Sequence, residues 1–89
     1  SNNLNWTNIN DVLNEKWNQS TIINLVNKHS LSFEEAKTLF MNVWLYANGL
    51  ATLIACNDLI MDSKEILIRI VKIYKELSKT LKNNEKTKN

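Results

Sequence analysis

The sequence predicts an all-α fold, a single domain built as a bundle of about four helices. Proline is absent from the 89 residues and glycine occurs only once, so the chain has few residues that make tight turns. Apolar residues make up 44% of the chain and recur three and four positions apart, as on one face of a helix. Two segments also carry the pattern of a capping residue followed three positions later by Glu, which is typical of helix starts.

The first predicted helix spans about residues 5–17. Ile9, Val12 and Leu13 have helical spacing there, which favours a short amphipathic helix. The polar residues 18–20 are expected to interrupt it. A second short helix is predicted at about 20–28, with Ser20 or Thr21 as its N-cap and a turn at His29 and Ser30.

Two longer helices follow. Ser32–Glu35 fits a capping box, in which the serine hydroxyl accepts from the Glu amide and the Glu carboxylate accepts from the serine amide. It predicts a helix over about 33–57. Asp62–Glu65 fits the same pattern and predicts a last helix over about 63–81.

The helix at 33–57 has two different apolar faces. At 100° per residue, one broad arc has the bulk of an ordinary core face. This arc contains Phe33, Ala36, Leu39, Phe40, Val43, Tyr46, Ala47, Leu50, Ala51 and Ile54, with Trp44 and Leu53 at its edges. The opposite side is polar up to Asn42 and then becomes small or apolar, at Leu45, Gly49, Thr52 and Cys56.

The last helix is apolar on adjacent stripes too, and two short helices cannot cover both long helices on every face. We therefore expect a second copy of the chain to supply the cover, so that two helices from each subunit form a four-helix bundle about a two-fold axis. The predicted homodimer interface consists of Leu45, Gly49, Thr52, Leu53, Cys56, Ile66, Ile70, Ile73 and Leu77.

Gly49, the only glycine, lies inside the most apolar run of the chain, 43–56. Glycine in a helix costs roughly 1 kcal/mol relative to alanine, so its presence calls for a reason. Two reasons are open: it permits close approach of helices across the dimer interface, or it accommodates an N-terminal helix of the same chain.

The segment 31–55 resembles the C-terminal domain of TetR/AcrR-type transcriptional regulators. That family often shows a Trp, then a His-Gly pair, then Leu/Ile-Ala-x-Leu on its penultimate helix. Trp44 and Gly49 match, as does Leu50–Leu53, whereas Asn48 stands in the histidine position. The resemblance extends over about 31–81, because a helix with an acidic start follows here as it does in the family.

The resemblance implies an effector-sensing and dimerisation domain of a transcriptional repressor, in which the two long helices form the dimer interface. A ligand bound between helices would shift the helices that lead to the DNA-binding heads. The family's N-terminal helix-turn-helix domain is absent from this chain, so DNA is expected as a partner only through that domain. The alternative is a small helical protein-interaction and dimerisation module with no ligand and no role on DNA.

Phe40, Trp44 and Asn48 are successive positions on one side of the long helix and form the candidate ligand site. They offer apolar walls and one amide, as a pocket for a small hydrophobic effector requires. An aromatic stripe at this spacing also occurs in plain helical cores, and that reading stays open.

No pattern points to an enzyme, a cofactor or a metal. His29 is the only histidine and no Cys or carboxylate motif accompanies it at metal-ligand spacing, so it is expected to be a turn residue. Cys56 is expected to be a packed structural thiol and not a reactive one, because it lies on the small-residue side of the helix and has no basic residue beside it in the sequence. Glu34 and Glu35 lie in a helix first turn, where they complement the helix dipole.

Net charge, cysteine content and hydropathy argue against several further classes of protein. The net charge is +2 and there is no arginine cluster, which gives no sign of direct nucleic-acid binding. A lone cysteine cannot form an intrachain disulfide. The polar N-terminal residues do not form a signal peptide, and the run 43–56 is shorter than the ~20 residues of a membrane span. We expect a cytoplasmic protein with no membrane contact.

Overall fold

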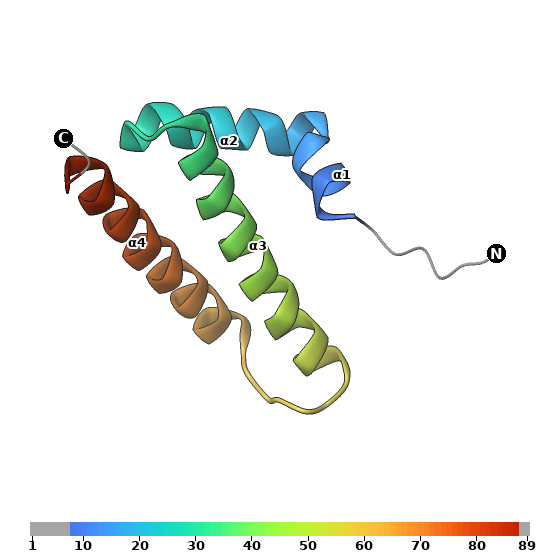
Figure 1. Ribbon diagram of the computed structural model, residues 1–89. Helices are drawn as coiled ribbons and strands as arrows, with labels where there is room; N and C mark the ends of the chain where they lie inside the picture. Colours follow the sequence, from blue (N-terminus) through green and yellow to red (C-terminus); the bar gives the residue numbers. More distant parts are fainter. Residues whose placement is uncertain (1–7, 88–89) are drawn as a thin grey trace.

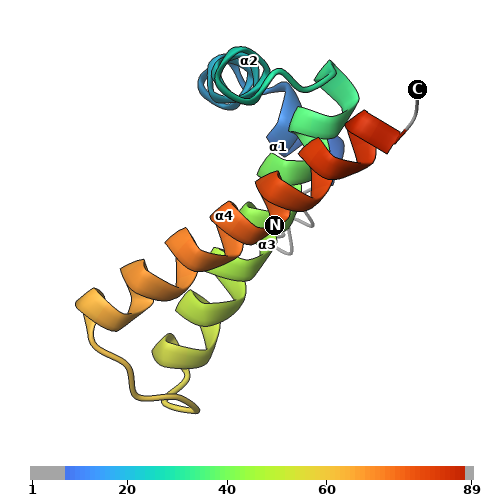
Figure 2. The same cartoon turned by 90° about the vertical axis from the view of Figure 1, so that its left-hand side faces the viewer.

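The computed structural model describes residues 8–87, with side chains as far as residue 83. These residues form four helices and no strand, so the predicted all-α class is confirmed. The helices are α1 (Ile9–Asn14), α2 (Lys16–His29), α3 (Phe33–Ala55) and α4 (Ser63–Thr87). In Figure 1, α3 and α4 run antiparallel, and α2 lies across one end of this pair. Figure 2 shows α2 almost end-on with α3 and α4 side by side below it.

The break between the first two helices lies at Glu15, and the prediction of a break at 18–20 was wrong. Glu15 has extended backbone angles, whereas 18–20 continue α2. The reason is that the side chains of Asn18 and Gln19 form hydrogen bonds with the end of α1. Their amides donate to two carbonyls near the end of α1, at 2.8 and 3.3 Å, and so satisfy groups that a helix end leaves free. Residues 5–7 of the predicted first helix lie outside the described residues.

The start of α3 has the predicted capping box. The Ser32 hydroxyl accepts from the Glu35 amide at 3.1 Å, and the Ser32 amide donates to the Glu35 carboxylate at 3.0 Å. Its other end stops at Ala55, two residues before the predicted end. Asn57 adopts the left-handed conformation (φ 62°), and the amide of Asp58 reaches back to the carbonyl of Leu53 at 2.9 Å, as in a Schellman motif.

The start of α4 forms one half of the second predicted capping box. The Asp62 carboxylate accepts from the Glu65 amide at 2.8 Å. The Glu65 carboxylate pairs instead with Arg69, one turn further along, at 3.0 Å. The helix continues to Thr87, beyond the predicted end at residue 81.

The buried core lies at the end of the molecule where α1 and α2 meet the first half of α3. Leu13, Ile22 and Ala36 form its centre, and Ile22 and Leu39 are fully buried. The partly buried side chains packed against that centre are Ile9, Leu25, Val26, Phe40 and Met41. Among the described helices, α4 alone lies beside the far half of α3, so this half of the molecule is a two-helix arm (Figure 1).

The helix α3 is also long and apolar enough to cross a membrane by length and composition alone. It has 23 residues, its most apolar window has a mean hydropathy of 1.3, and 6% of that window is buried inside the chain. The run 43–56, on which the expectation of no membrane span was based, is shorter than this helix. The same length and composition occur in core helices of soluble proteins, so the finding does not place the chain in a membrane.

Candidate functional site

A cavity of about 280 Å³ lies between α2, α3 and α4. Phe40 and Trp44, two of the three predicted ligand-site residues, form part of its wall because they lie one turn apart on α3. The full lining consists of Thr21, Leu25, Leu39, Phe40, Val43, Trp44, Ala47 and Tyr74. The cavity is thus formed by α2 and the middle of α3, with Tyr74 as its one lining residue from α4.

Asn48, the third predicted ligand-site residue, is exposed and is not among the residues that line the cavity. Its side-chain amide donates to the Trp44 carbonyl one turn earlier at 2.8 Å. The helical spacing therefore brings two of the three side chains to the cavity. Sequence reasoning did not find Thr21, Leu25 or Tyr74 as lining residues, because nothing in the sequence says which positions of α2 and α4 meet α3.

The two hydroxyl groups in the cavity wall already have partners within the protein. Thr21 donates to the carbonyl of Trp17 at 3.2 Å, within α2. The Tyr74 hydroxyl is hydrogen-bonded to Nε2 of His29. The surface that a ligand would contact in the cavity is therefore formed almost entirely by aliphatic and aromatic carbon.

His29 ends α2, as predicted for a residue at a helix end, but it also contacts α4. Its ring lies edge-on to the Tyr74 ring with centroids 5.5 Å apart, and the Lys28 ammonium lies 5.9 Å from the same tyrosine ring. Burial lowers the pKa of His29 below its ordinary value of 6.5, and the positive charges of Lys28 and Lys82 lower it further. These surroundings favour the neutral form of His29, and its contact with Tyr74 joins α2 to α4 beside the cavity.

A second surface follows the α3 part of the predicted dimer interface. Leu45 is 50% exposed and Leu53 is 44% exposed, and Gly49, Thr52 and Cys56 are exposed as well. The Thr52 hydroxyl donates to the carbonyl of Asn48 at 2.9 Å, so its donor is satisfied inside the helix. This side of α3 is consequently an open face of apolar or internally satisfied groups.

Gly49 and Cys56 both lie on this open face. A Cβ built on Gly49 would meet no atom of the described chain within 4 Å, so the glycine does not accommodate an N-terminal helix of its own chain. Cys56 is exposed in the single chain, directly after α3 ends at Ala55, so the predicted packing of its thiol depends on cover by a second copy. The alternative in which Gly49 serves contact with a second copy stays a prediction.

The α4 part of the predicted interface lies differently. Ile66, Ile70, Ile73 and Leu77 are half-buried where α4 lies beside α3. The strongly exposed residues belong to the neighbouring side of the helix, with Leu67 62% exposed and Ile68 57% exposed. Helical spacing predicted the apolar stripes, but it could not say which of them α3 covers.

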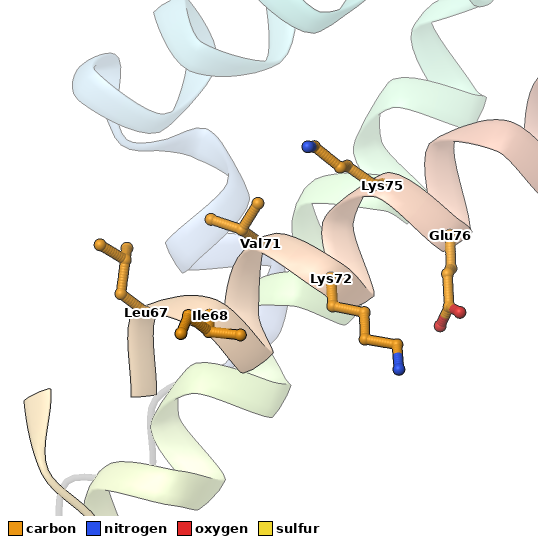
Figure 3. Close-up of a pocket in the computed structure, with 6 residues that line it drawn as sticks. All are labelled: Leu67, Ile68, Val71, Lys72, Lys75 and Glu76. Atoms are coloured by element: carbon orange, nitrogen blue, oxygen red, sulfur yellow. The ribbon is translucent and has the colours of Figure 1, made fainter. Parts of the chain in front are cut away.

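These exposed residues form an open hollow of about 500 Å³ on α4 (Figure 3). Leu67, Ile68 and Val71 form its apolar end, and the charged side chains lie further along the helix. The charged group consists of Lys72, Lys75 and Glu76. Exposed apolar side chains with charged residues beside them are typical of a surface that contacts another protein.

Among the side chains that the structure describes, residues 8–83, no three of His, Cys, Asp or Glu gather as they would to hold a metal ion. Comparison of the chain with protein-family models, curated proteins and solved structures gives no significant match. The resemblance to TetR/AcrR-type regulators therefore stays a prediction from the residues of α3 and α4.

Proposed function

We propose that this chain is the effector-sensing and dimerisation domain of a TetR-type transcriptional repressor that acts in the cytoplasm. Operator DNA would be bound by a helix-turn-helix domain outside this sequence. The observation that carries the proposal is the arrangement around α3. This one helix has the family-like motif from Trp44 to Leu53, forms one wall of the cavity, and presents an open apolar face.

The cavity supports the sensing part because three helices meet there. A ligand among its side chains would touch α2, α3 and, through Tyr74, α4. Tyr74 is also hydrogen-bonded to His29 at the end of α2. Occupancy that moves the Tyr74 ring would change how α4 lies relative to α2, and a ligand that prefers one arrangement shifts the population towards it.

The open faces support the dimerisation part. Exposed apolar side chains extend over both helices of the two-helix arm, at Leu45 and Leu53 on α3 and at Leu67, Ile68 and Val71 on α4. Removing apolar surface from water contributes roughly 25 cal/mol per Å², which favours an occupant for these faces. A second copy related by a two-fold axis covers them with the same residues and yields a four-helix bundle.

Sedimentation equilibrium of the chain tests the dimer. We expect a dimer at micromolar concentrations, and we expect Gly49→Leu to give a monomer of unchanged helical circular dichroism. Thr38→Leu is the matched control, because Thr38 is exposed on the polar first half of the same side of α3 and should leave the dimer intact.

A wild-type chain that stays monomeric at high micromolar concentration would overturn the dimerisation part. Flotation with lipid vesicles supplies a further check, because α3 is long and apolar enough to span a bilayer. A chain that floats with vesicles would show that lipid, and not a second copy, covers the open faces.

A further inference from the structure

The wall of the cavity restricts what can bind in it. Six of its eight residues are aliphatic or aromatic hydrocarbons, apart from the indole nitrogen of Trp44. The other two, Thr21 and Tyr74, have hydroxyls that are engaged with Trp17 and His29. The lining therefore contains no cationic or carboxylate side chain to pair with a charged ligand.

This lack of charge penalises ionised molecules. An ion that enters an apolar site loses its hydration and gains no partner in return, which is far more costly than the transfer of a neutral molecule. The Lys28 ammonium on α2 lies 5.9 Å from the centroid of the Tyr74 ring, and Lys28 is not among the lining residues. The cavity thus favours an uncharged occupant.

Its size sets the second restriction. Apolar cavities of about 150 Å³ bind benzene, and drug-sized ligands occupy pockets of roughly 300–1,000 Å³. At about 280 Å³, this cavity, which is partly open to solvent, has room for one or two rings among its lining side chains. Phe40, Trp44 and Tyr74 in its wall suit flat ring systems, because aromatic rings stack or pack edge to face.

We infer that the cavity binds an uncharged, mostly hydrocarbon molecule of one or two fused rings, held against Phe40, Trp44 and Tyr74. This inference rests on the proposed sensing function and names the chemical class of its effector. Within that function, the ligand class follows from the wall itself: neutral carbon surface, satisfied hydroxyls and a volume of about 280 Å³.

The test uses naphthalene and 2-naphthoate, which share a ring system and differ in charge. The full chain is labelled with ¹⁵N, and the indole N–H resonance of Trp44 is assigned by comparison with Trp44→Phe. We expect naphthalene to shift this resonance saturably. We expect 2-naphthoate to bind at least about tenfold more weakly, since its carboxylate would be desolvated without a partner.

Two alanines on α3 provide a matched pair of variants. Ala47→Phe fills the cavity and should abolish the naphthalene shift, whereas Ala51→Phe adds the same ring at an exposed position outside it and should leave the shift unchanged. If Ala47→Phe loses its helical circular dichroism, Thr21→Met fills the cavity from α2 and should weaken naphthalene binding.

The outcomes separate the ligand class from the function. Binding of 2-naphthoate as tight as that of naphthalene would overturn the ligand class and leave the cavity as an effector site. If neither probe shifts the Trp44 resonance, both the ligand class and the sensing part of the proposed function are wrong. The dimerisation part is decided separately by sedimentation.

Discussion

Replacing Gly49 by alanine should stabilise the single chain and weaken its self-association. The described residues leave open space where the new methyl group would lie, since none of their atoms outside the neighbouring helix backbone approaches within 4 Å of the Cβ position. Gly49 also has no positive φ, so alanine fits its helical backbone without strain. The substitution should therefore act on the monomer only through helix propensity.

Propensity sets the size of the first effect. Alanine in place of glycine in a helix interior gains about 1 kcal/mol, and 1 kcal/mol raises the Tm of a domain of this length by roughly 4–8 °C. The second effect has the opposite sign. An extra methyl group at a close helix contact between two copies costs about 1–3 kcal/mol through overpacking.

Thermal unfolding followed by circular dichroism at low and high protein concentration measures both effects. At concentrations where sedimentation shows a monomer, Gly49→Ala should have the higher Tm. At concentrations where the wild type is a dimer, that advantage should shrink or reverse. Ala51→Gly is the control, because it removes a methyl group from an exposed position of α3 and should lower the Tm at every concentration.

Two results would refute the reasoning. A lower Tm for the monomeric Gly49→Ala variant would mean that part of the chain occupies the space beside Gly49. An equal gain at all concentrations would mean that Gly49 is not at a contact between copies.

Three further predictions concern the core, the cap and the histidine. Leu39→Ala should lower the free energy of unfolding in urea by about 2–5 kcal/mol, because Leu39 is fully buried. Leu53→Ala, at an exposed position, should cost under about 1 kcal/mol in the monomer. Similar losses in the two variants would contradict the observed burial. Ser32→Ala should cost about 1 kcal/mol of unfolding free energy by removing the acceptor of the Glu35 amide, and an unchanged urea midpoint would show that this cap contributes nothing. Because folding lowers the pKa of His29, the unfolded chain binds more protons, and stability should fall as the pH drops below about 6.5. His29→Gln should remove that part of the pH dependence, and an unchanged urea-midpoint profile between pH 7.5 and 5 would assign it to other groups.

Much of the fold could be predicted from local patterns in the sequence. The Ser32–Glu35 capping box placed the start of α3, and helical spacing grouped Phe40 with Trp44 at what proved to be a cavity wall. The predicted break at 18–20 was wrong, because a run of polar residues is typical of a break between helices. Asn18 instead lies within α2, and its side chain satisfies a carbonyl of α1, a tertiary contact that a linear pattern does not contain.

The candidate site was less predictable for the same reason. Tyr74 enters the cavity wall because α4 returns antiparallel to α3, and its contact with His29 joins residues 45 positions apart. Spacing identified the apolar stripes on α4, but which of them α3 covers depends on how the turn after Asn57 orients the returning helix. Such orientations are set by packing between elements and not by the residues of one element.

The core lies at one end of the molecule, so local opening should differ between its two ends. Amide hydrogens near α1 and α2 are protected by buried side chains such as Ile22, whereas those around the turn between α3 and α4 rely on two helices alone. In the monomer, the tip of the two-helix arm should therefore exchange its amide hydrogens for deuterium first, by local opening that leaves the other end intact. The half expected to exchange slowly is the half that forms the cavity, so opening at the tip would leave a ligand in place.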